Sequence, residues 1–509
     1  MLPVLVLVSC SKEGTSLVEA DPVSTKEKVE LLGHESIELG RKLENPYSVT
    51  NVRQALSAVY PTRAVIDVPV TDYYVRFLPK NVEEFDRISR LGVELMDHPI
   101  DREILRDGDY YHDPEIPEGE ITWQYAVVPP DFEFPDGICY EILDKCFIPD
   151  ENVETRSPGD YDWEAVERMS FELTGNGGLL EPMTRARSKP SGTISIIDDN
   201  LRSRKTVGVS CVKVVANVFV RIATTYTDEK GHYQFSAKFS AKPHYRICFK
   251  NKTGFSIGLN LILVPASISA LGKGPSTGKD CLIDKNSDKT LFRRCAVNNA
   301  AYDYYKQCQA TGVTMPPKNL RPSSTLMMHH GALLDSKLVS KYLGKYSSLI
   351  RIFAPDITIG SKDKNGNYAE LYSTTVHEMA HASHFSKVGK DYWRKYATYI
   401  ITSFINTGDA YGTGNGENAG YCQVGEMWGY FMENSLYKER YGRDPGYGQN
   451  YWFAPRIFSE LESGGLTRAD ICSCLNYYVN DLKSLKAALL ENYAAKSSLI
   501  NKVFKKYSR

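Results

Sequence analysis

The sequence has no run of about eighteen apolar residues, so it predicts no membrane-spanning helix. It also lacks an excess of either charge, because 61 Lys and Arg are balanced by 62 Asp and Glu, for a formal net charge of −1. Proteins that bind nucleic acid usually carry an excess of positive charge, which this chain lacks, so nucleic acid is not an expected partner. Histidine is scarce, with 10 in 509 residues, so a motif that places two of them together is informative.

Cysteine is sparse as well, with 11 residues spread along the chain. Setting Cys10 aside leaves an even number, which permits disulfides in an exported protein but is too few for a disulfide scaffold. Cys472 and Cys474 are separated by one residue, and this gap is shorter than the spacing of a structural zinc knuckle. We expect both to lie within a helix.

The chain begins with a short apolar segment, MLPVLVLVSC, which ends at Cys10 and is followed by polar residues. Leu7-Val8-Ser9-Cys10 resembles the lipobox of bacterial lipoproteins, whose signal peptide is removed so that the cysteine becomes the acylated first residue. The resemblance implies a signal peptide over 1–10, a linker over 11–45 and a lipid anchor on Cys10. It also implies surface exposure at a bacterial outer membrane. A buried N-terminal strand is the alternative, and the abrupt change to polar sequence counts against it.

The composition, with 42% hydrophobic and 24% charged residues, is that of a globular protein, and the length suggests roughly three domains. The segment Thr71 to Pro99 predicts a strand, a helix and a strand, with Asn81 capping the helix and Gly92 ending it. We expect this small βαβ unit to belong to an α+β domain over 46–150 that has no chemistry of its own. A connecting segment over 151–190 would follow.

Short β runs separated by turns begin at Ser191. They include Thr227-Asp228, Gly231, Tyr233 and Phe235, in a Thr-Asp-x-x-Gly-x-Tyr-x-Phe pattern. This pattern resembles a hairpin of the carboxypeptidase regulatory-like, or transthyretin-like, β-sandwich. The resemblance implies a β-sandwich over 191–265 that serves as a structural spacer. Asp228 and Gly231 would shape the turn, while Tyr233 and Phe235 would alternate onto the core face.

Residues 266–509 predict a mainly helical domain, which makes the whole chain a multidomain α+β protein. The strand Leu349 to Gly360 contains Pro355, which favours a sheet edge, and an edge strand can bind a peptide by adding it as a further strand. A strand buried in the core is the alternative. The expected helices are Ser287 to Thr311, Asp391 to Thr407, Tyr421 to Asn434 and two or three more after Leu466.

One helical segment, LYSTTVHEMAHASHF from Leu371 to Phe385, contains His377-Glu378-x-x-His381. Residues four apart share one face of a helix, so His377 and His381 can both direct a ring nitrogen at one metal ion. Zinc suits these ligands, and a catalytic zinc keeps three protein ligands and a water. Glu378 can take a proton from that water, which predicts peptide hydrolysis. The alternative is a surface helix that happens to carry two histidines.

Glu426 lies in the helical segment Tyr421 to Asn434, which is otherwise apolar on one face. An ionised carboxylate is rarely buried without a partner or a metal, so we expect Glu426 to be the third ligand. Glu433, one heptad further on, is the competing candidate. His384 shares the face of the two motif histidines, and we expect it to be packed or to support a ligand rather than to bind the metal.

The motif and the segment Gly425-Glu426, which places its Glu 45 residues after His381, together resemble the gluzincin class of zinc metallopeptidases. The resemblance implies a zincin-like domain with His377, His381 and Glu426 as zinc ligands and Glu378 as the base. Thermolysin-like members carry Asp four residues after the ligand Glu, whereas this chain has Tyr430, so the group that supports the first histidine is unassigned. A Tyr or His of the C-terminal helices is expected to stabilise the oxyanion, and the sequence does not assign it.

These observations predict an endopeptidase that cleaves extracellular proteins or glycoproteins. The rival hypothesis is a non-catalytic surface binding lipoprotein with a structural or vestigial zinc site. Glu378 discriminates between the two, because a structural site has no need of a general base.

Overall fold

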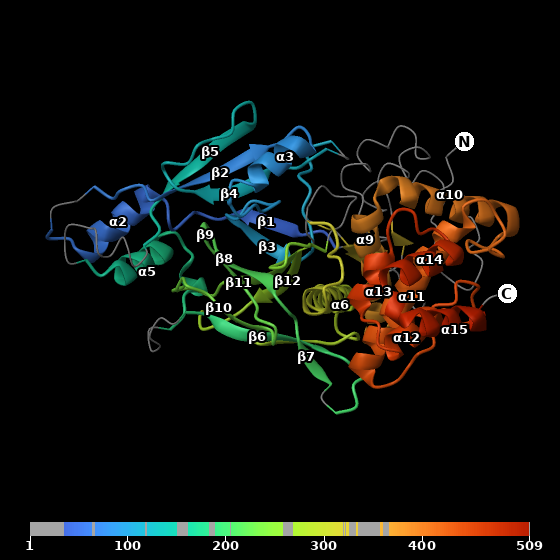
Figure 1. Ribbon diagram of the computed structural model, residues 1–509. Helices are drawn as coiled ribbons and strands as arrows, with labels where there is room; N and C mark the ends of the chain where they lie inside the picture. The colour runs from blue at the N-terminus through green and yellow to red at the C-terminus, as the bar shows by residue number, and fades with distance from the viewer. Residues whose placement is uncertain are drawn as a thin grey trace.

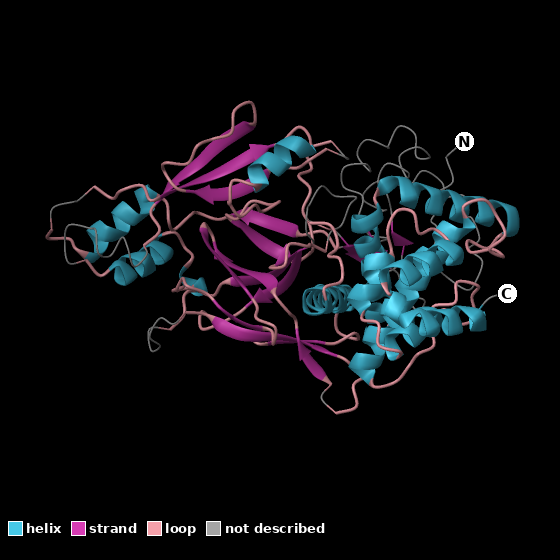
Figure 2. Ribbon diagram, in the orientation of Figure 1, coloured by secondary structure: helices cyan, strands magenta, loops and turns pink. Residues whose placement is uncertain are grey.

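The computed structural model describes residues 35–63, 67–117, 120–149, 161–182, 189–203, 205–257, 268–318, 320, 322–324, 332–333, 357–359 and 366–507. Cys10 and the expected signal peptide lie outside these residues, as does most of the strand expected from Leu349 to Gly360. The architecture is mixed α+β with several antiparallel sheets; most of the strands lie before residue 284, and most of the helices gather at the C-terminal end (Figures 1 and 2). Within the described ranges, none of the helices has the length and apolar character needed to span a membrane.

The N-terminal region is built on a three-stranded sheet in which β2 is central and antiparallel to both neighbours, β4 and β5. The expected βαβ unit is therefore wrong. Both sides of β2 are already paired, and the segment after α3 contributes only a bridge between Met96 and Tyr125. Asn81 does cap α3, because its side chain accepts a hydrogen bond from the backbone N–H of Glu84. The elements are β1 (Glu38–Lys42), α2 (Val49–Val59), β2 (Asp72–Leu78), α3 (Val82–Ser89), β3 (Arg102–Arg106), β4 (Gln124–Val128) and β5 (Cys139–Cys146).

The segment 151–190, expected to be a connection, contains the helix α5 (Trp163–Leu173) and the short 3-10 helix η1 (Gly177–Leu179). Trp163 and Val166 of α5 pack against Val52 and Leu56 of α2 in a small core of their own. This burial explains why the segment folds onto the N-terminal region, at the far end of the molecule from the C-terminal helices (Figure 1).

A second β-rich region consists of two sheets, one ordered β12-β11-β8-β9 and the other β10-β6-β13 with β7 paired to β6. Two of its strands lie beyond residue 265, so the β-rich region extends to Ile283. The strands are β6 (Ser191–Ile197), β7 (Thr206–Gly208), β8 (Val212–Val218), β9 (Arg221–Tyr226), β10 (His232–Gln234), β11 (His244–Asn251), β12 (Ile268–Lys273) and β13 (Cys281–Ile283).

The turn between β9 and β10 has the expected local structure, but the two strands belong to different sheets and do not pair as a hairpin. The Asp228 side chain accepts hydrogen bonds from the backbone N–H groups of Lys230 and His232. Gly231 has a φ of +82°, and a Cβ at that position would lie 2.1 Å from the carbonyl oxygen of Ile194, so only glycine fits. Tyr233 and Phe235 are both buried in the core, as the alternation of the strand predicts.

The C-terminal half begins with α6, which lies between the second β-rich region and the other helices (Figure 1). Asp288 caps it, and Gly312 ends it in the left-handed conformation. The expected helix is confirmed, but it is buried on most sides because it packs on β11 and on α9. The helices are α6 (Lys289–Thr311), α9 (Tyr368–Val388), α10 (Lys390–Thr407), α11 (Ala419–Tyr441), α12 (Arg456–Ser463), α13 (Arg468–Cys474), α14 (Leu482–Asn492), the 3-10 helix η3 (Ala494–Lys496) and α15 (Ser497–Tyr507).

A small three-stranded sheet precedes α9 in the sequence and contacts it. Its strands are β14 (Pro322–Ser324), β15 (Ala332–Leu333) and β16 (Ile357–Ile359). β16 is the central strand, parallel to β14 and antiparallel to β15. The expectation of an edge strand is therefore wrong for 357–359. Pro355 precedes these residues in the sequence, so its missing N–H does not interrupt their pairing.

The ten cysteines that the structure describes are all free thiols, so the disulfides that the sequence permits are not formed among them. Cys472 and Cys474 lie in α13, which confirms that they belong to a helix rather than to a zinc knuckle. The helices after Leu466 are also confirmed, and Leu485 and Leu489 of α14 are fully buried.

Candidate metal centre

Two long helices, α9 and α11, carry the motif residues and pack against each other. His377 of α9 meets Glu433 of α11, and His381 meets Glu426. The residue numbers rise along α9 as they fall along α11, so the two helices are antiparallel. This packing brings together two segments that the sequence predicted separately.

His377, His381 and Glu426 form a compact group of ligand atoms. The Nε2 atom of His377 lies 3.4 Å from Oε2 of Glu426, and Nε2 of His381 lies 3.3 Å from Oε1. One potential ligand atom from each residue lies within 4.8 Å of the others. Tetrahedral ligands at about 2.1 Å from a metal ion are about 3.4 Å from one another, so the two carboxylate–imidazole separations are compatible with a bound metal ion such as zinc.

Gly429 makes room between the two imidazoles. It lies on α11, one helical turn after Glu426, and a Cβ there would be 2.8 Å from Cε1 of His377 and 2.9 Å from Cε1 of His381. The same Cβ would lie 3.0 Å from Nε2 of His377. The absence of a side chain at this position therefore leaves the space in which the ligand nitrogens converge, and the residues present fit a metal ion.

Gly429→Ala is expected to weaken zinc binding by at least about 10-fold, because the new methyl group displaces both imidazole rings. Removal of the contacts that orient metal ligands typically lowers metal affinity by about 10- to 100-fold, and displacement of the rings should have an effect of similar size. Helix propensity alone would favour alanine by about 1 kcal/mol, so the loss would not come from the helix. Zinc titration against a chelating indicator measures the effect. Gly178→Ala is the control, since it is the same substitution in the helical segment η1 and its Cβ meets nothing within 4 Å. Equal affinities in the two variants would contradict the role of Gly429.

Two tyrosine hydroxyls hold the carboxylate of Glu426. Tyr396 of α10 donates a hydrogen bond to Oε1, and Tyr411, from the loop between α10 and α11, donates to Oε2 at 3.0 Å. Burial acts to raise the pKa of Glu426, but the neighbouring His381 and His377 outweigh it and keep the pKa below its ordinary value. Glu426 is thus an ionised and oriented carboxylate, as a metal ligand must be.

Glu433 supports the first histidine. Its Oε2 atom lies 3.0 Å from Nδ1 of His377, a distance at which the carboxylate accepts a hydrogen bond from the ring N–H. This contact leaves Nε2 facing Glu426, which is the usual arrangement around a metal-binding histidine. Glu433 therefore fills the supporting role that the sequence left unassigned, and Glu426 rather than Glu433 belongs to the ligand group. The Tyr430 ring packs edge-on against His377, with centroids 4.5 Å apart.

Glu378 is almost fully buried, at 1% exposure. Within the described part of the chain, neither of its carboxylate oxygens has a hydrogen-bond partner. Burial raises the pKa of Glu378 to about 8; the negative charges of Glu426 and Glu433 add to this rise, and His377 opposes it. A buried carboxyl group without partners is costly, and proteins retain such groups where chemistry needs them.

His384 lies outside the ligand group. It packs edge-on against the rings of Tyr392 and Trp393, at centroid distances of 5.0 and 5.7 Å. Burial lowers its pKa to about 3, so the ring is neutral. His384 is a packed residue on the same helix, in agreement with the sequence-based expectation.

Comparisons of the chain with protein-family models, with curated proteins and with solved structures found no match. The chemistry of this site therefore rests on its own residues and geometry.

Sequence reasoning missed Tyr396, Tyr411 and Gly429. Each of these residues contributes to the metal centre only through a contact with another segment of the chain. The sequence around each residue contains no pattern that predicts this contact. The sequence offers Glu433 only as a competing ligand. Its spacing of seven residues from Glu426 places both carboxylates on one face of α11, and this spacing was the signal for its supporting role.

Proposed function

We propose that the chain is a zinc-dependent endopeptidase in which His377, His381 and Glu426 hold the metal and Glu378 is the general base. The observation that carries the proposal is the buried carboxyl group of Glu378, which directly follows His377 on α9 and has no hydrogen-bond partner among the described residues. A zinc ion beside this group would lower its pKa and favour the ionised form, which can accept a proton from water and return it to the departing amine.

Zinc, when bound, supplies the positive charge that activates water and polarises the peptide carbonyl. Glu378 then accepts the water proton on a carboxylate oxygen and delivers it to the nitrogen of the broken peptide bond. Glu433 keeps His377 oriented through Nδ1, while Tyr396 and Tyr411 orient Glu426. These supporting contacts keep the ligands in place while the proton moves.

The alternative is a non-catalytic protein with a structural zinc site. Its support is burial, since the ligand group and Glu378 are at most 3% exposed. A closed shell of protein is typical of structural zinc, whereas a catalytic ion keeps one position for water. Glu378 favours catalysis, because a structural site gains nothing from a further acidic group in its interior that binds neither the metal nor a ligand.

The proposed place of action follows from the lipobox-like segment that ends at Cys10. A lipid anchor there would hold the protein at the outer membrane, exposed at the cell surface, where its substrates would be extracellular proteins or glycoproteins. Labelling of the full-length protein with radioactive palmitate in a bacterial host, with Cys10→Ala as the control, tests this part separately from the chemistry.

Removal of the metal is expected to abolish hydrolysis and its return to restore it. The purified chain should contain one zinc ion by mass spectrometry and should cleave casein; treatment with 1,10-phenanthroline should remove both properties, and added zinc should restore both. Metal-free protein that cleaves casein as fast as the loaded form would refute the proposal. Loaded protein that is inactive on a broad panel of proteins and glycoproteins would favour the structural alternative.

A further inference from the structure

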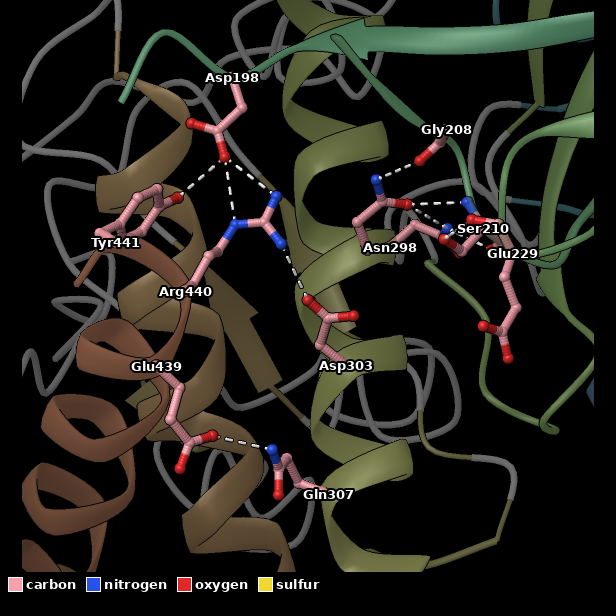
Figure 3. A network of polar contacts seen from close by, with 11 residues as sticks. Asp198, Gly208, Ser210, Glu229, Asn298, Asp303, Gln307, Glu439, Arg440 and Tyr441 are labelled. Atoms are coloured by element: carbon pink, nitrogen blue, oxygen red, sulfur yellow. Dashed lines mark hydrogen bonds and ion pairs between the residues drawn. The ribbon is translucent and has the colours of Figure 1, made fainter. Parts of the chain in front are cut away.

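The last turn of α11 carries Arg440, whose guanidinium group binds a carboxylate from the second β-rich region (Figure 3). Oδ2 of Asp198, the residue that follows β6, lies 3.1 Å from Nε and 3.0 Å from Nη2 of Arg440. The same oxygen accepts a hydrogen bond from the Tyr441 hydroxyl at 3.2 Å. Asp198 is fully buried, so this group of contacts is shielded from solvent.

Arg440 also contacts the two other helices at this junction. Its Nη1 atom donates a hydrogen bond to Asp303 of α6 at 3.1 Å. The guanidinium lies over the rings of Tyr368 and Tyr372 of α9, 4.9 and 4.8 Å from their centroids. One side chain therefore joins β6, α6, α9 and α11, and the planar guanidinium permits these contacts only in a narrow range of positions.

The second β-rich region is itself fixed to α6. Asn298 donates a hydrogen bond to the carbonyl oxygen of Ser210 at 2.9 Å (Figure 3). Asn299 donates one to the carbonyl oxygen of Gly208 at 2.8 Å. The Asn299 side chain in turn accepts one from the backbone N–H of Ser210 at 2.9 Å. Two of these three bonds are buried and the third is partly buried, so Asp198 extends from a region that is hydrogen-bonded to α6.

The contacts between α9 and α11 form a series that begins at Arg440 and ends at the metal ligands. Tyr372 meets Tyr441, His377 meets Glu433, and His381 meets Glu426. Arg440 is seven residues from Glu433, about 10 Å along the helix. A slide or rotation of α11 on α9 would change all three contacts together, and a metal site tolerates deviations of only about 0.2 Å.

We infer that Asp198 is a positioning residue of the metal centre, which acts through Arg440 to set the register of α11 on α9 and hence the separation of Glu426 from the two histidines. The second β-rich region is then part of the metal-binding unit, not a spacer as the sequence suggested. The inference rests on the metal site of the proposed function and does not depend on peptidase activity.

The test measures metal binding by the full chain carrying Asp198→Asn. Co²⁺ alone is the probe, since its visible absorption reports the geometry of its ligands, and zinc affinity follows by competition. We expect a changed Co²⁺ spectrum and zinc binding weaker by about 2- to 30-fold, the range of substitutions that act on a binding site through other residues. Glu229→Gln is the matched control, because Glu229 lies in the same β-rich region and contacts α6 through Tyr302 and Lys306. It should leave spectrum and affinity unchanged.

Arg440→Lys provides a second variant, which keeps the charge but loses the planar group; it should alter the Co²⁺ spectrum in the same direction. The double variant Asp198→Asn, Arg440→Lys should lose less zinc affinity than the sum of the two single losses, because both changes disrupt the same Asp198–Arg440 contact. Wild-type spectrum and affinity in both single variants, with only a lower unfolding temperature, would overturn the inference. Failure of the wild type to bind Co²⁺ or zinc would overturn it together with the proposed function, whereas metal binding without hydrolysis would contradict only the peptidase proposal.

Discussion

Glu378→Gln is expected to lower the rate of peptide hydrolysis by about 10²- to 10⁴-fold while leaving the zinc content at that of the wild type. The glutamine amide keeps the size of the side chain but cannot accept the proton of water. Glu378 lies outside the group of ligand atoms, so its replacement leaves all three ligands in place. The substitution also removes an unpaired carboxyl group from a buried site, and we expect the variant to be at least as stable as the wild type.

The measurement combines kcat/KM on a fluorogenic peptide library with zinc content by mass spectrometry and with thermal unfolding. Glu370→Gln is the matched control, since Glu370 lies on the same helix, in its first turn and two turns before the motif. It should retain activity within about 3-fold, as expected of a substitution away from the reacting groups. A Glu378→Gln variant with full zinc and full activity would show that another group is the base. A variant that loses zinc along with activity would instead assign Glu378 to metal binding.

The elements that carry the site were predictable because their signals are local. The helix of His377 and His381 was expected from their four-residue spacing, and the structure adds Asn367, whose side chain caps α9 at the backbone N–H of Glu370. Gly408 stands directly after the last residue of α10 with a φ of +72°, as a helix-ending glycine does. Glu426 was identified because a charged residue in an apolar helix needs a partner.

The errors and omissions depend on contacts between distant segments. The order of strands around β2 is set by pairing with residues about 50 to 70 positions away, which no local pattern encodes. The hydroxyl of Tyr411 reaches Glu426 across a turn between two helices, and Glu433 reaches His377 across the helix pair. Their roles follow from the register of α11 on α9, and that register is fixed in part by Arg440 and Asp198.

Glu426→Gln is expected to reduce zinc affinity by more than about 100-fold, whereas Glu433→Gln should reduce it by only about 10- to 100-fold. The first change removes the anionic ligand that faces both histidines at 3.3 and 3.4 Å. The second removes the acceptor of the His377 Nδ1 hydrogen bond, which orients the ring without contacting the metal. Both substitutions are the same in size and charge, lie on one helix and replace buried carboxylates, so each is the control for the other.

Zinc affinity is measured by competition with a chelator of known strength, and Co²⁺ spectra separate the two roles. Glu433→Gln should keep a spectrum with three protein ligands, because its ligand atoms are all present. Glu426→Gln should show little Co²⁺ absorption when Co²⁺ is not in large excess over the protein, since two imidazoles alone bind the ion weakly. The reverse order of affinities would make Glu433 the third ligand. In that case the metal would bind the carboxylate of Glu433, and the hydroxyls of Tyr396 and Tyr411 would hold the carboxylate of Glu426 without any role in metal binding.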